Sequence, residues 1–368
     1  MKIDGRLESL DALRGFDMMF IMGLAALISA ICALFPGGSD CALATQMTHV
    51  DWEGFRHHDT IFPLFLFIAG ASWPFSYAKQ VAKGASRGRI WGKIFYRGLM
   101  LFAIGVVYNG FFNFDFPNLR WMGVLQHIGL AWMFAAMLFV SFTPKVRAVI
   151  AAVLLVGYWL LLKFIPAPDM PGYGPYTFEG NLPGFVDRMC LPGKLYNGTF
   201  DPEGILSLIP ATVTAMLGMF TGEFLRIPEE KIPGGKKTLM MLGAAAVMLA
   251  VGLLWSLEFP IIKKIWTSTF VLVAGAYSLA MMAVFYWIID VKGWRKWAFP
   301  FTVMGMNSIT VYLAKRIIGV TAINKFFFGG LAGLCSEGWS NVILSFGSLL
   351  FIWLLSLFLY RKNIFLKV

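Results

Sequence analysis

Three of the four histidines of this chain lie in one short polar segment. His49, His57 and His58 fall within THVDWEGFRHHDTIFP (residues 48–63), beside charged residues of both signs. A neutral imidazole can take a proton from a hydroxyl or an amine near neutral pH, which is the work of a general base. If the loop folds back, the carboxylate of Asp59 could orient His49, as the third member of a catalytic triad does. The alternative, which spacing alone favours, is three solvated loop histidines.

Asp59 stands at the mouth of an apolar segment, because TIFPLFLFIAGA follows it directly. A carboxylate at or inside a membrane span is costly, and it is usually partnered or functional. The same carboxylate could instead cap a helix by accepting backbone N–H groups. The sequence leaves the functional and the capping role of Asp59 equally open.

The composition indicates that these residues are positioned by a bundle of membrane helices. The chain has 368 residues, of which 58% are hydrophobic and only 14% are charged, and its mean hydropathy is +0.70. Soluble domains carry about 25% charged residues, and a run of roughly 20 apolar residues is long enough to span a bilayer. We therefore predict an all-α, polytopic membrane protein with about ten transmembrane helices. The predicted spans are residues 10–35, 60–78, 93–113, 121–142, 146–165, 204–225, 237–257, 267–289, 298–318 and 340–360, with about four residues of uncertainty at each end.

Lys and Arg indicate the orientation of the bundle. About two-thirds of the 31 basic residues fall on one side if the N-terminus and the C-terminus are both cytoplasmic, which is the positive-inside pattern. The histidine segment and a long Pro- and Gly-rich loop (about residues 166–203) then lie outside. The same pattern accounts for the net charge of +11, so we predict no nucleic-acid partner. We predict one transmembrane domain, residues 1–368.

The four cysteines show no spacing typical of a metal site, and we predict no metal. Three of them fall in segments predicted to lie outside, so a disulfide between two of these three stays open. These three are Cys41, Cys190 and Cys335.

Arg14 lies three residues from both Asp11 and Asp17 at the start of the first predicted span, near one helical face. It is either part of an ion-paired helix end or a ligand for an anion, since a guanidinium pairs bidentately with phosphate. Polar residues also occur inside later apolar segments, where they line a bundle interior or a wet cavity or hold helices together. These are Gln126, His127, Asn307 and Ser308.

Six segments together resemble the transmembrane acetyltransferases of the heparan-α-glucosaminide N-acetyltransferase family. In chain order they are RLESLDALRGFDMM, HVDWEGFRHHDTIFPLFLFIAG, RWMGVLQHIGLAW, DPEGILSLIPATVTAMLGMFTGE, KKIWTSTFVLVAGAYS and GMNSITVYLA. They occur in the family's order from about residue 6 to about residue 316, so the resemblance covers most of the chain.

The resemblance implies that acetyl-CoA, bound from the cytosol in a path through the bundle, donates an acetyl group to a glucosamine-like acceptor on the other side. It carries the catalytic role onto His49 through the pattern His49, Trp52, Gly54 and Asp59. His49 would either deprotonate the acceptor directly or carry the acetyl group itself. His57 and His58 match no family histidine.

The predicted site has three parts. The catalytic residues are His49 and Asp59; the acetyl-CoA-binding residues are Arg14, Arg97, Gln126, His127, Asn307 and Ser308; the acceptor-binding residues are Trp52, Glu53 and Arg120. The predicted partners are acetyl-CoA, a small sugar or glycan acceptor and the lipid bilayer. The predicted location is the bacterial inner membrane. The family also implies a homodimer, for which the sequence gives no support of its own.

The sequence departs from the family at two places and leaves two other functions open. The family's asparagine before the histidine has no counterpart in PGGSDCALATQMT, and its VLQR motif reads VLQH, with His127 in place of arginine. An O-acyltransferase acting on polysaccharide hydroxyls is one alternative. A secondary transporter is the other, because buried polar residues and helices interrupted by Pro63, Pro210 and Pro300 also suit a transporter, although the two halves show no internal repeat.

Overall fold

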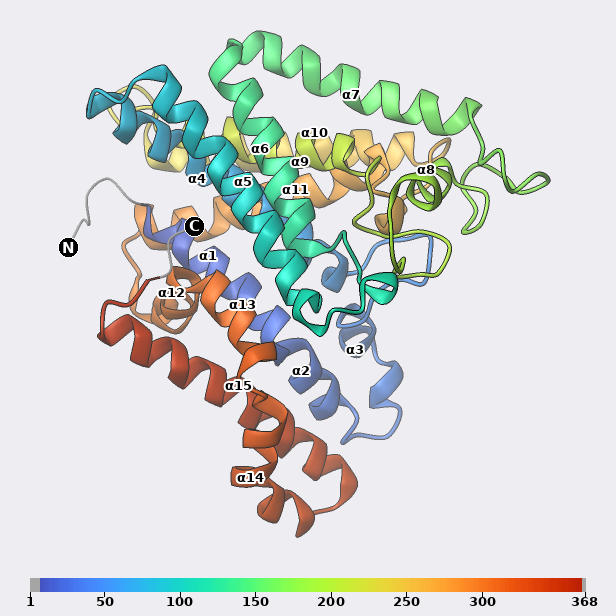
Figure 1. The fold of residues 1–368 in the computed structure, drawn as a ribbon. Helices are drawn as coiled ribbons and strands as arrows, with labels where there is room; N and C mark the ends of the chain where they lie inside the picture. The colour runs from blue at the N-terminus through green and yellow to red at the C-terminus, as the bar shows by residue number, and fades with distance from the viewer. Residues whose placement is uncertain (1–6, 366–368) are drawn as a thin grey trace. The chain divides into compact units, whose positions relative to one another are not determined.

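The structure, a computed structural model, describes residues 7–365. These residues form helices joined by turns and loops, and they contain no strand, only two isolated backbone bridges, Glu53–Ile262 and Arg120–Gly193. The predicted all-α class is therefore confirmed (Figure 1).

The helices follow one another along the chain, and several are separated only by a turn. They are α1 (Glu8–Met19), a π-helical turn (Phe20–Leu24), α2 (Ala25–Cys32), α3 (Ala42–Gln46), α4 (Ile61–Ala82), α5 (Arg87–Tyr108), α6 (Val124–Ser141), α7 (Pro144–Phe164), α8 (Leu182–Cys190), α9 (Leu208–Leu225), α10 (Gly234–Trp255), α11 (Ser268–Tyr286), α12 (Phe299–Met306), α13 (Ser308–Ile317), α14 (Val320–Gly333) and α15 (Glu337–Arg361).

Nine helical segments within the described residues are long and apolar enough to cross a membrane. They are α1 with α2, then α4, α5, α6, α7, α9, α10, α11 with the turn that follows it, and α15. This supports an integral membrane protein built as a polytopic helix bundle, and nine of the ten predicted spans coincide with these helices.

The predicted span at 298–318 is wrong as a single helix. The chain leaves the helix at Asn307 (φ −121°, ψ 27°), so α12 and α13 are separate helices of 8 and 10 residues. Each is shorter than the roughly 20 residues that a spanning helix needs. The segment has the average composition of a span, but composition does not report a break in the backbone.

The described residues form two compact units. The first comprises the described parts of Met1–Val50, Arg56–Ile61 and Met281–Lys367, and the second comprises Asp51–Phe55 and Phe62–Ala280. The histidine segment contributes residues to both units.

In the first unit, α1 and α12 pack backbone against backbone. A Cβ atom on Gly15 would lie 1.6 Å from the carbonyl oxygen of Phe301, and one on Gly305 would lie 1.9 Å from that of Asp11. Small residues allow such close approach between membrane helices. The ring of Phe16 adds edge-to-face contacts with Phe285 and Phe301. The residues of the SLDALRGF segment are therefore fixed by α12, and α1 holds its polar side chains in a defined place.

In the second unit, α4 packs against α9 in the same way. A Cβ atom on Gly70 would lie 2.1 Å from the carbonyl oxygen of Ala215, and one on Gly218 would lie 2.0 Å from that of Phe67. Buried Trp73 and Trp132, from α4 and α6, meet edge to face with their ring centroids 5.2 Å apart. These contacts make α4, α6 and α9 the frame that carries the loops of this unit.

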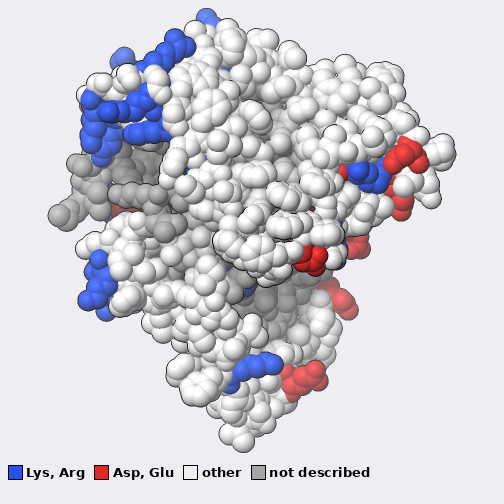
Figure 2. Space-filling model, in the orientation of Figure 1, with Lys and Arg blue, Asp and Glu red and all other residues white. Residues whose placement is uncertain are grey.

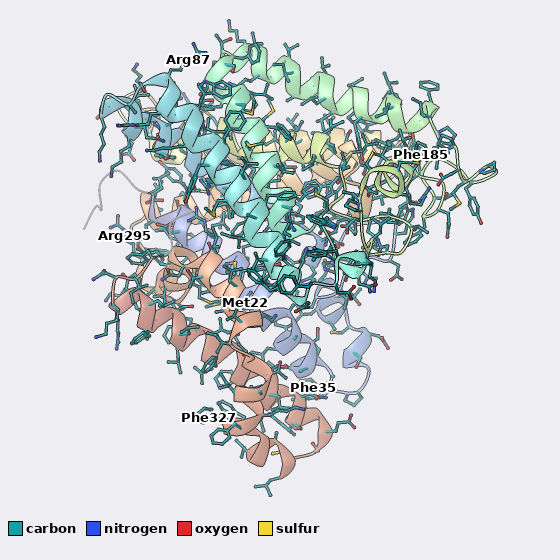
Figure 3. The ribbon with its side chains drawn as sticks, in the orientation of Figure 1. Met22, Phe35, Arg87, Phe185, Arg295 and Phe327 are labelled. Carbon is teal, nitrogen blue, oxygen red and sulfur yellow. The ribbon has the colours of Figure 1, made fainter. Side chains whose placement is uncertain are left out.

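Charge is segregated along the second unit. Basic side chains gather at the turn between α4 and α5 (Figure 2), and the basic residues of this turn are Lys79, Lys83, Arg87 and Arg89. Figure 3 labels Arg87 at this end and Phe185 of α8 at the opposite end, near which acidic side chains are visible in Figure 2. One basic end is what the positive-inside pattern predicts for a bundle that crosses a membrane.

Candidate active site

His49 and Asp59 meet in the first unit. The Nδ1 atom of His49 lies 2.8 Å from Oδ1 of Asp59, the imidazole is 54% exposed, and the carboxylate is 1% exposed. A buried carboxylate on Nδ1 fixes the ring orientation and stabilises the ring when it takes a proton at Nε2. The loop thus folds back as the contact between the two residues requires, and the pair has the geometry of an oriented base beside solvent.

The loop that carries His49 is tied back by hydrogen bonds along its own length. Nη1 of Arg56 donates to Oγ1 of Thr48 at 2.7 Å and to the carbonyl oxygen of His49 at 3.0 Å. The backbone N–H of His57 donates to Oε1 of Gln46 at 2.7 Å. These bonds draw the two ends of residues 46–57 together. His49 and Asp59, which are ten residues apart in the chain, can therefore come into contact.

Asp59 has the capping role as well as the contact with His49. Its Oδ2 accepts the backbone N–H of Arg56 at 3.1 Å and that of Val50 at 3.4 Å. The first of these bonds caps the short helical turn His57–Thr60 that leads into α4. The two interpretations left open by the sequence are thus compatible, since one carboxylate orients the ring and fastens the turn.

The other two loop histidines lie on different sides of the pair. The ring of His58 has its centroid 4.4 Å from that of His49, whereas the ring of His57 packs edge to face on Phe20 at 4.6 Å. His58 is therefore a neighbour of the candidate base. His57 belongs to the packing around α1 and the turn that follows it.

Two of the predicted acceptor-binding residues lie in the second unit, on the segment 51–55. Nε1 of Trp52 donates to the carbonyl oxygen of Tyr176 at 2.8 Å, and its ring packs on Phe178 and Phe200. Glu53 is exposed and bridges Ile262 through its backbone. Trp52 is thus anchored by the long loop, and the Glu53 carboxylate faces solvent.

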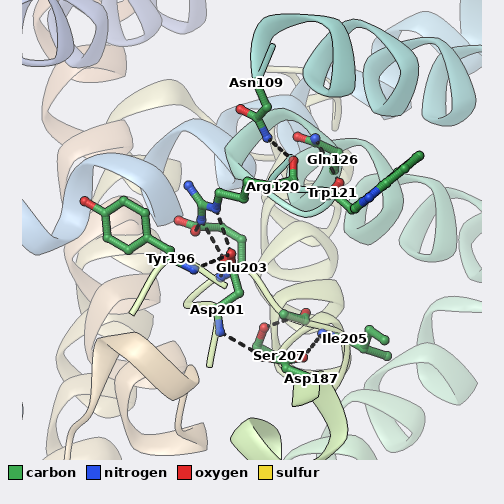
Figure 4. A network of polar contacts seen from close by, with 11 residues as sticks. Asn109, Arg120, Trp121, Gln126, Asp187, Tyr196, Asp201, Glu203, Ile205 and Ser207 are labelled. Atoms are coloured by element: carbon green, nitrogen blue, oxygen red, sulfur yellow. Dashed lines mark hydrogen bonds and ion pairs between the residues drawn. The ribbon is translucent and has the colours of Figure 1, made fainter. Parts of the chain in front are cut away.

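Arg120, the third predicted acceptor-binding residue, is held in a polar network of the second unit (Figure 4). Its guanidinium pairs bidentately with Asp201, at 2.7 Å from Nε to Oδ2 and 2.5 Å from Nη2 to Oδ1, and it also pairs with Glu203. It also lies 4.5 Å from the ring centre of Tyr196. Burial lowers the pKa of Arg120, but the two carboxylates have the larger effect, so the pKa of Arg120 is raised. Burial also raises the pKa of Glu203. Two carboxylates already compensate its charge, so the structure gives Arg120 a role in joining loops.

Replacing Arg120 by Gln should destabilise the protein by about 3–5 kcal/mol, the usual cost of removing one partner of a buried ion pair. Asp201 is 1% exposed, so its charge would be left without its main partner. Thermal unfolding in detergent measures the effect. Lys163→Gln is the matched control: its pair with Glu258 is 37% and 54% exposed, and such pairs contribute about 1 kcal/mol or less. Equal shifts for both variants would contradict the role of the network.

The same network should make stability depend on pH through Asp187. Burial raises the pKa of Asp187 to about 7. The backbone N–H groups of Ile205 and Asp201, which donate to its carboxylate, and the charge of Arg188 lower this pKa, whereas the charge of Asp201 raises it. An unfolded aspartate titrates at about 3.9. Between these values the folded state keeps a proton that the unfolded state has lost, so stability falls as pH rises through this window.

We therefore expect the melting temperature to be lower at about pH 8 than at about pH 5, and Asp187→Asn to reduce this difference. Asp169→Asn is the control, because Arg188 lowers the pKa of Asp169 and places its titration below this window. A wild-type pH dependence in Asp187→Asn would exclude Asp187 as its source.

Three of the predicted donor-binding residues lie in the first unit. Arg14 pairs with Asp11 at 3.3 Å and is 19% exposed, which is the ion-paired helix end that the sequence allowed. Asn307 and Ser308 stand at the break between α12 and α13 and are buried. Neither side-chain polar atom of Asn307 has a hydrogen-bond partner among the described residues. An unsatisfied buried amide is expensive, so Asn307 is suited to a polar ligand or water.

The other three lie in the second unit. Gln126 is buried, and its Nε2 donates to the carbonyl oxygen of Trp121 at 3.1 Å, so it fixes a loop (Figure 4). His127 is wholly buried between the rings of Phe62 and Trp266, and neither ring nitrogen has a hydrogen bond of ordinary geometry within residues 7–365. Arg97 lies over the ring of Trp132, 4.3 Å from its centre.

Four residues that support the site do not stand out in the sequence. Arg56 and Gln46 close the histidine loop, and Asp201 and Glu203 hold Arg120. Arg56 and Gln46 could have been found from the sequence, because each is a polar residue within ten positions of His49. No sequence signal connects Arg120 to carboxylates about eighty positions away.

Within residues 7–365, no group of three or more His, Cys, Asp or Glu side chains is arranged to hold a metal ion. The pair of His49 and Asp59 can act without one, as an acid–base couple that takes a proton at Nε2.

Comparisons with known proteins match this chain to one family. The profile of "Heparan-alpha-glucosaminide N-acetyltransferase, catalytic" matches residues 6–259. The chain is similar to the human protein named heparan-alpha-glucosaminide N-acetyltransferase, with 29% identity over 85% of this chain and 53% of the relative. It is similar to the mouse protein of the same name, with 27% identity over 85% of this chain and 54% of the relative. The chain thus spans about half the length of the curated relatives it matches.

Proposed function

The chain belongs to the heparan-alpha-glucosaminide N-acetyltransferase family, and from this we propose that it transfers an acetyl group from acetyl-CoA to an amino sugar. The matched region includes the candidate residues of both units from Arg14 to Arg120. The donor approaches from the cytosol and the acceptor from the outer face, with both termini cytoplasmic. The whole chain acts as one transmembrane domain, in the bacterial inner membrane and as a homodimer.

One observation carries the proposal: an exposed histidine with a buried carboxylate on its Nδ1 atom. Acetyl transfer to an amine needs a group that accepts a proton as the nitrogen attacks the carbonyl carbon. His49 meets this need because Asp59 leaves Nε2 as the atom that takes the proton. The family match supports acyl transfer, and the geometry of the pair supports His49 as the group that accepts the proton.

We assign the reaction as direct transfer. The acceptor nitrogen attacks the thioester carbonyl and forms the new C–N bond, while its proton passes to Nε2 of His49. The C–S bond breaks, and the leaving thiolate takes the proton from the imidazolium, so the ring returns to its neutral form. Asp59 stays ionised and stabilises the imidazolium between the two proton transfers.

Basic residues support the donor side of the proposal. The Lys and Arg side chains at the α4–α5 turn suit the phosphates of acetyl-CoA, since a guanidinium binds phosphate bidentately. Arg14 of the first unit stays a predicted donor contact, although its guanidinium already pairs with Asp11 at 3.3 Å. Asn307, with its unsatisfied amide, would contact the amide-containing arm of the donor.

Trp52 and Glu53 support the acceptor side. An indole ring can pack on a sugar ring, and an exposed carboxylate attracts an ammonium group. His49, Trp52 and Glu53 lie within five residues of one another in the chain.

The proposal is tested by incubating the purified protein, in detergent, with acetyl-CoA labelled in the acetyl group and with glucosamine. Labelled N-acetylglucosamine is the expected product. A parallel panel of sugars that carry hydroxyl groups but no amine distinguishes the O-acyltransferase alternative. Transfer to hydroxyl sugars alone would replace the amino sugar by a polysaccharide hydroxyl as the acceptor.

Absence of acetyl-CoA binding would remove the transferase assignment and favour the transporter. The break between α12 and α13 is the observation that favours this second candidate, because interrupted helices form the substrate sites of many transporters. Binding of acetyl-CoA is measured on the same protein by the shift of its melting temperature, since a ligand that binds only the folded state stabilises it.

A further inference from the structure

Two cysteines of the first unit lie side chain to side chain. Cys32 is the last residue of α2 and Cys41 directly precedes α3, and the thiol of Cys32 donates a hydrogen bond to the sulfur of Cys41. Both side chains are half-buried. The sequence places Cys32 inside a predicted span, away from the other three cysteines, so this pairing is a finding of the structure.

The backbone between the two cysteines forms a compact reversal. The N–H of Phe35 donates to the carbonyl oxygen of Cys32, that of Gly38 to Phe35, and that of Cys41 to Gly38, at 3.1, 2.9 and 3.3 Å. A Cβ atom on Gly38 would lie 1.8 Å from the carbonyl oxygen of Cys32. Only glycine permits this approach, which brings the chain back onto Cys32 and places α3 beside α2 (Figure 1).

Cys41 is the more reactive of the two by its surroundings. Its sulfur accepts the backbone N–H of Ala44 at 3.4 Å. This bond is the main cause that lowers the pKa of the Cys41 thiol, and the hydrogen bond from Cys32 acts in the same direction. The thiolate is the nucleophile in disulfide exchange.

We propose that Cys32 and Cys41 are a disulfide-forming pair that an external disulfide oxidises. The thiolate of Cys41 attacks a sulfur of the external disulfide, which releases one thiol and leaves a mixed disulfide on Cys41. The sulfur of Cys32 then attacks Cys41, forms the Cys32–Cys41 bond and releases the second thiol. The protein loses two hydrogen atoms, and the external disulfide gains them as two thiols.

The bond would join the end of the first spanning segment to the segment that leads into the histidine loop. Cys41 directly precedes α3, which ends at Gln46, and Gln46 accepts the N–H of His57 at 2.7 Å. A covalent link at the base of α3 would therefore restrict the loop on which His49 lies. The oxidised form suits the outer side of a membrane, where disulfides persist.

The test uses the full-length protein in detergent with oxidised glutathione as the external disulfide. We expect two of the four thiols to be lost, and digestion without reductant to yield one cross-linked peptide pair containing Cys32 and Cys41. In Cys32→Ser, which lacks the resolving thiol, we expect a stable glutathione adduct on Cys41. The wild-type protein should not accumulate this adduct.

Cys190→Ser and Cys335→Ser are the matched controls, because each removes a thiol outside the pair and should leave the cross-link unchanged. Four thiols retained after treatment, a lasting glutathione adduct on wild-type Cys41, or a cross-link through Cys190 or Cys335 would each overturn the proposal. None of these readouts requires acetyl transfer, so they hold whether or not the proposed function is correct.

Discussion

His49→Ala is expected to lower kcat for acetyl transfer by about 10²- to 10⁴-fold, the usual contribution of a positioned general base. The ring is the only group that the His49–Asp59 pair offers to an acceptor proton, and alanine removes it. The affinity for acetyl-CoA should change little, because the proposed donor contacts lie on other residues. The measurement is single-turnover transfer of labelled acetyl groups, with donor binding followed separately.

Two further measurements separate a lost base from a damaged fold. His57→Gln is the matched control, because the ring of His57 packs on Phe20 rather than on His49. It should keep most of the activity. Free imidazole should restore part of the transfer in His49→Ala, since the ring is 54% exposed and its removal leaves an opening toward solvent. Transfer by His49→Ala at the wild-type rate would exclude His49 as the base.

An acetylated-histidine intermediate gives a different result in the same experiment. With acetyl-CoA alone, such an enzyme would hold labelled acetyl on His49 and release CoA in a burst. Direct transfer predicts no burst without an acceptor. Incubation with acetyl-CoA alone therefore distinguishes direct transfer from an acetylated-histidine intermediate.

The helices were predictable from sequence because a spanning helix is specified by local composition. In α10, every residue except Lys236, Lys237 and Thr238 is apolar or glycine. Inside a bilayer, an apolar segment of that length satisfies its backbone hydrogen bonds by forming a helix. The break at Asn307 was not predictable in this way. Its cause is a backbone conformation at one residue, φ −121° and ψ 27°, within a stretch whose average hydropathy is that of a span.

Both partners of the His49–Asp59 pair lie on one short loop, but spacing alone favoured three solvated loop histidines. The family pattern then selected His49 among three histidines, and the ring contact of His57 with Phe20 agrees with that choice. Sequence could not show that Asp59 also accepts backbone N–H groups, because these bonds depend on how residues 46–57 close upon themselves.

The assignment of Arg120 shows the opposite case. Arg120 stays a predicted acceptor contact, but its charge is already paired within the protein. Asp201 and Glu203, which pair with it, lie 81 and 83 residues further along. Long-range pairs of this kind are set by how the loops fold together, and no local pattern encodes them.

Asp59→Asn is expected to lower kcat by roughly 10³- to 10⁴-fold, with little change in acetyl-CoA affinity. The amide has nearly the shape of the carboxylate but carries no charge, so it stabilises the imidazolium less. If its nitrogen faces Nδ1, the ring must take the tautomer that has its proton on Nε2, and that tautomer cannot act as the base. Asp51→Asn is the matched control, because Asp51 is an exposed acid of the same polar stretch.

The capping role of Asp59 predicts a second, smaller effect that must be separated from the first. Oδ2 accepts the N–H groups of Arg56 and Val50, and an amide can preserve only part of this pattern. Loss of a cap costs about 0.5–2 kcal/mol, which lowers the melting temperature but leaves the folded fraction high. If kcat per folded molecule were unchanged and only stability fell, Asp59 would be a cap alone. A loss of kcat in protein that is folded and binds acetyl-CoA would assign Asp59 to the positioning of His49.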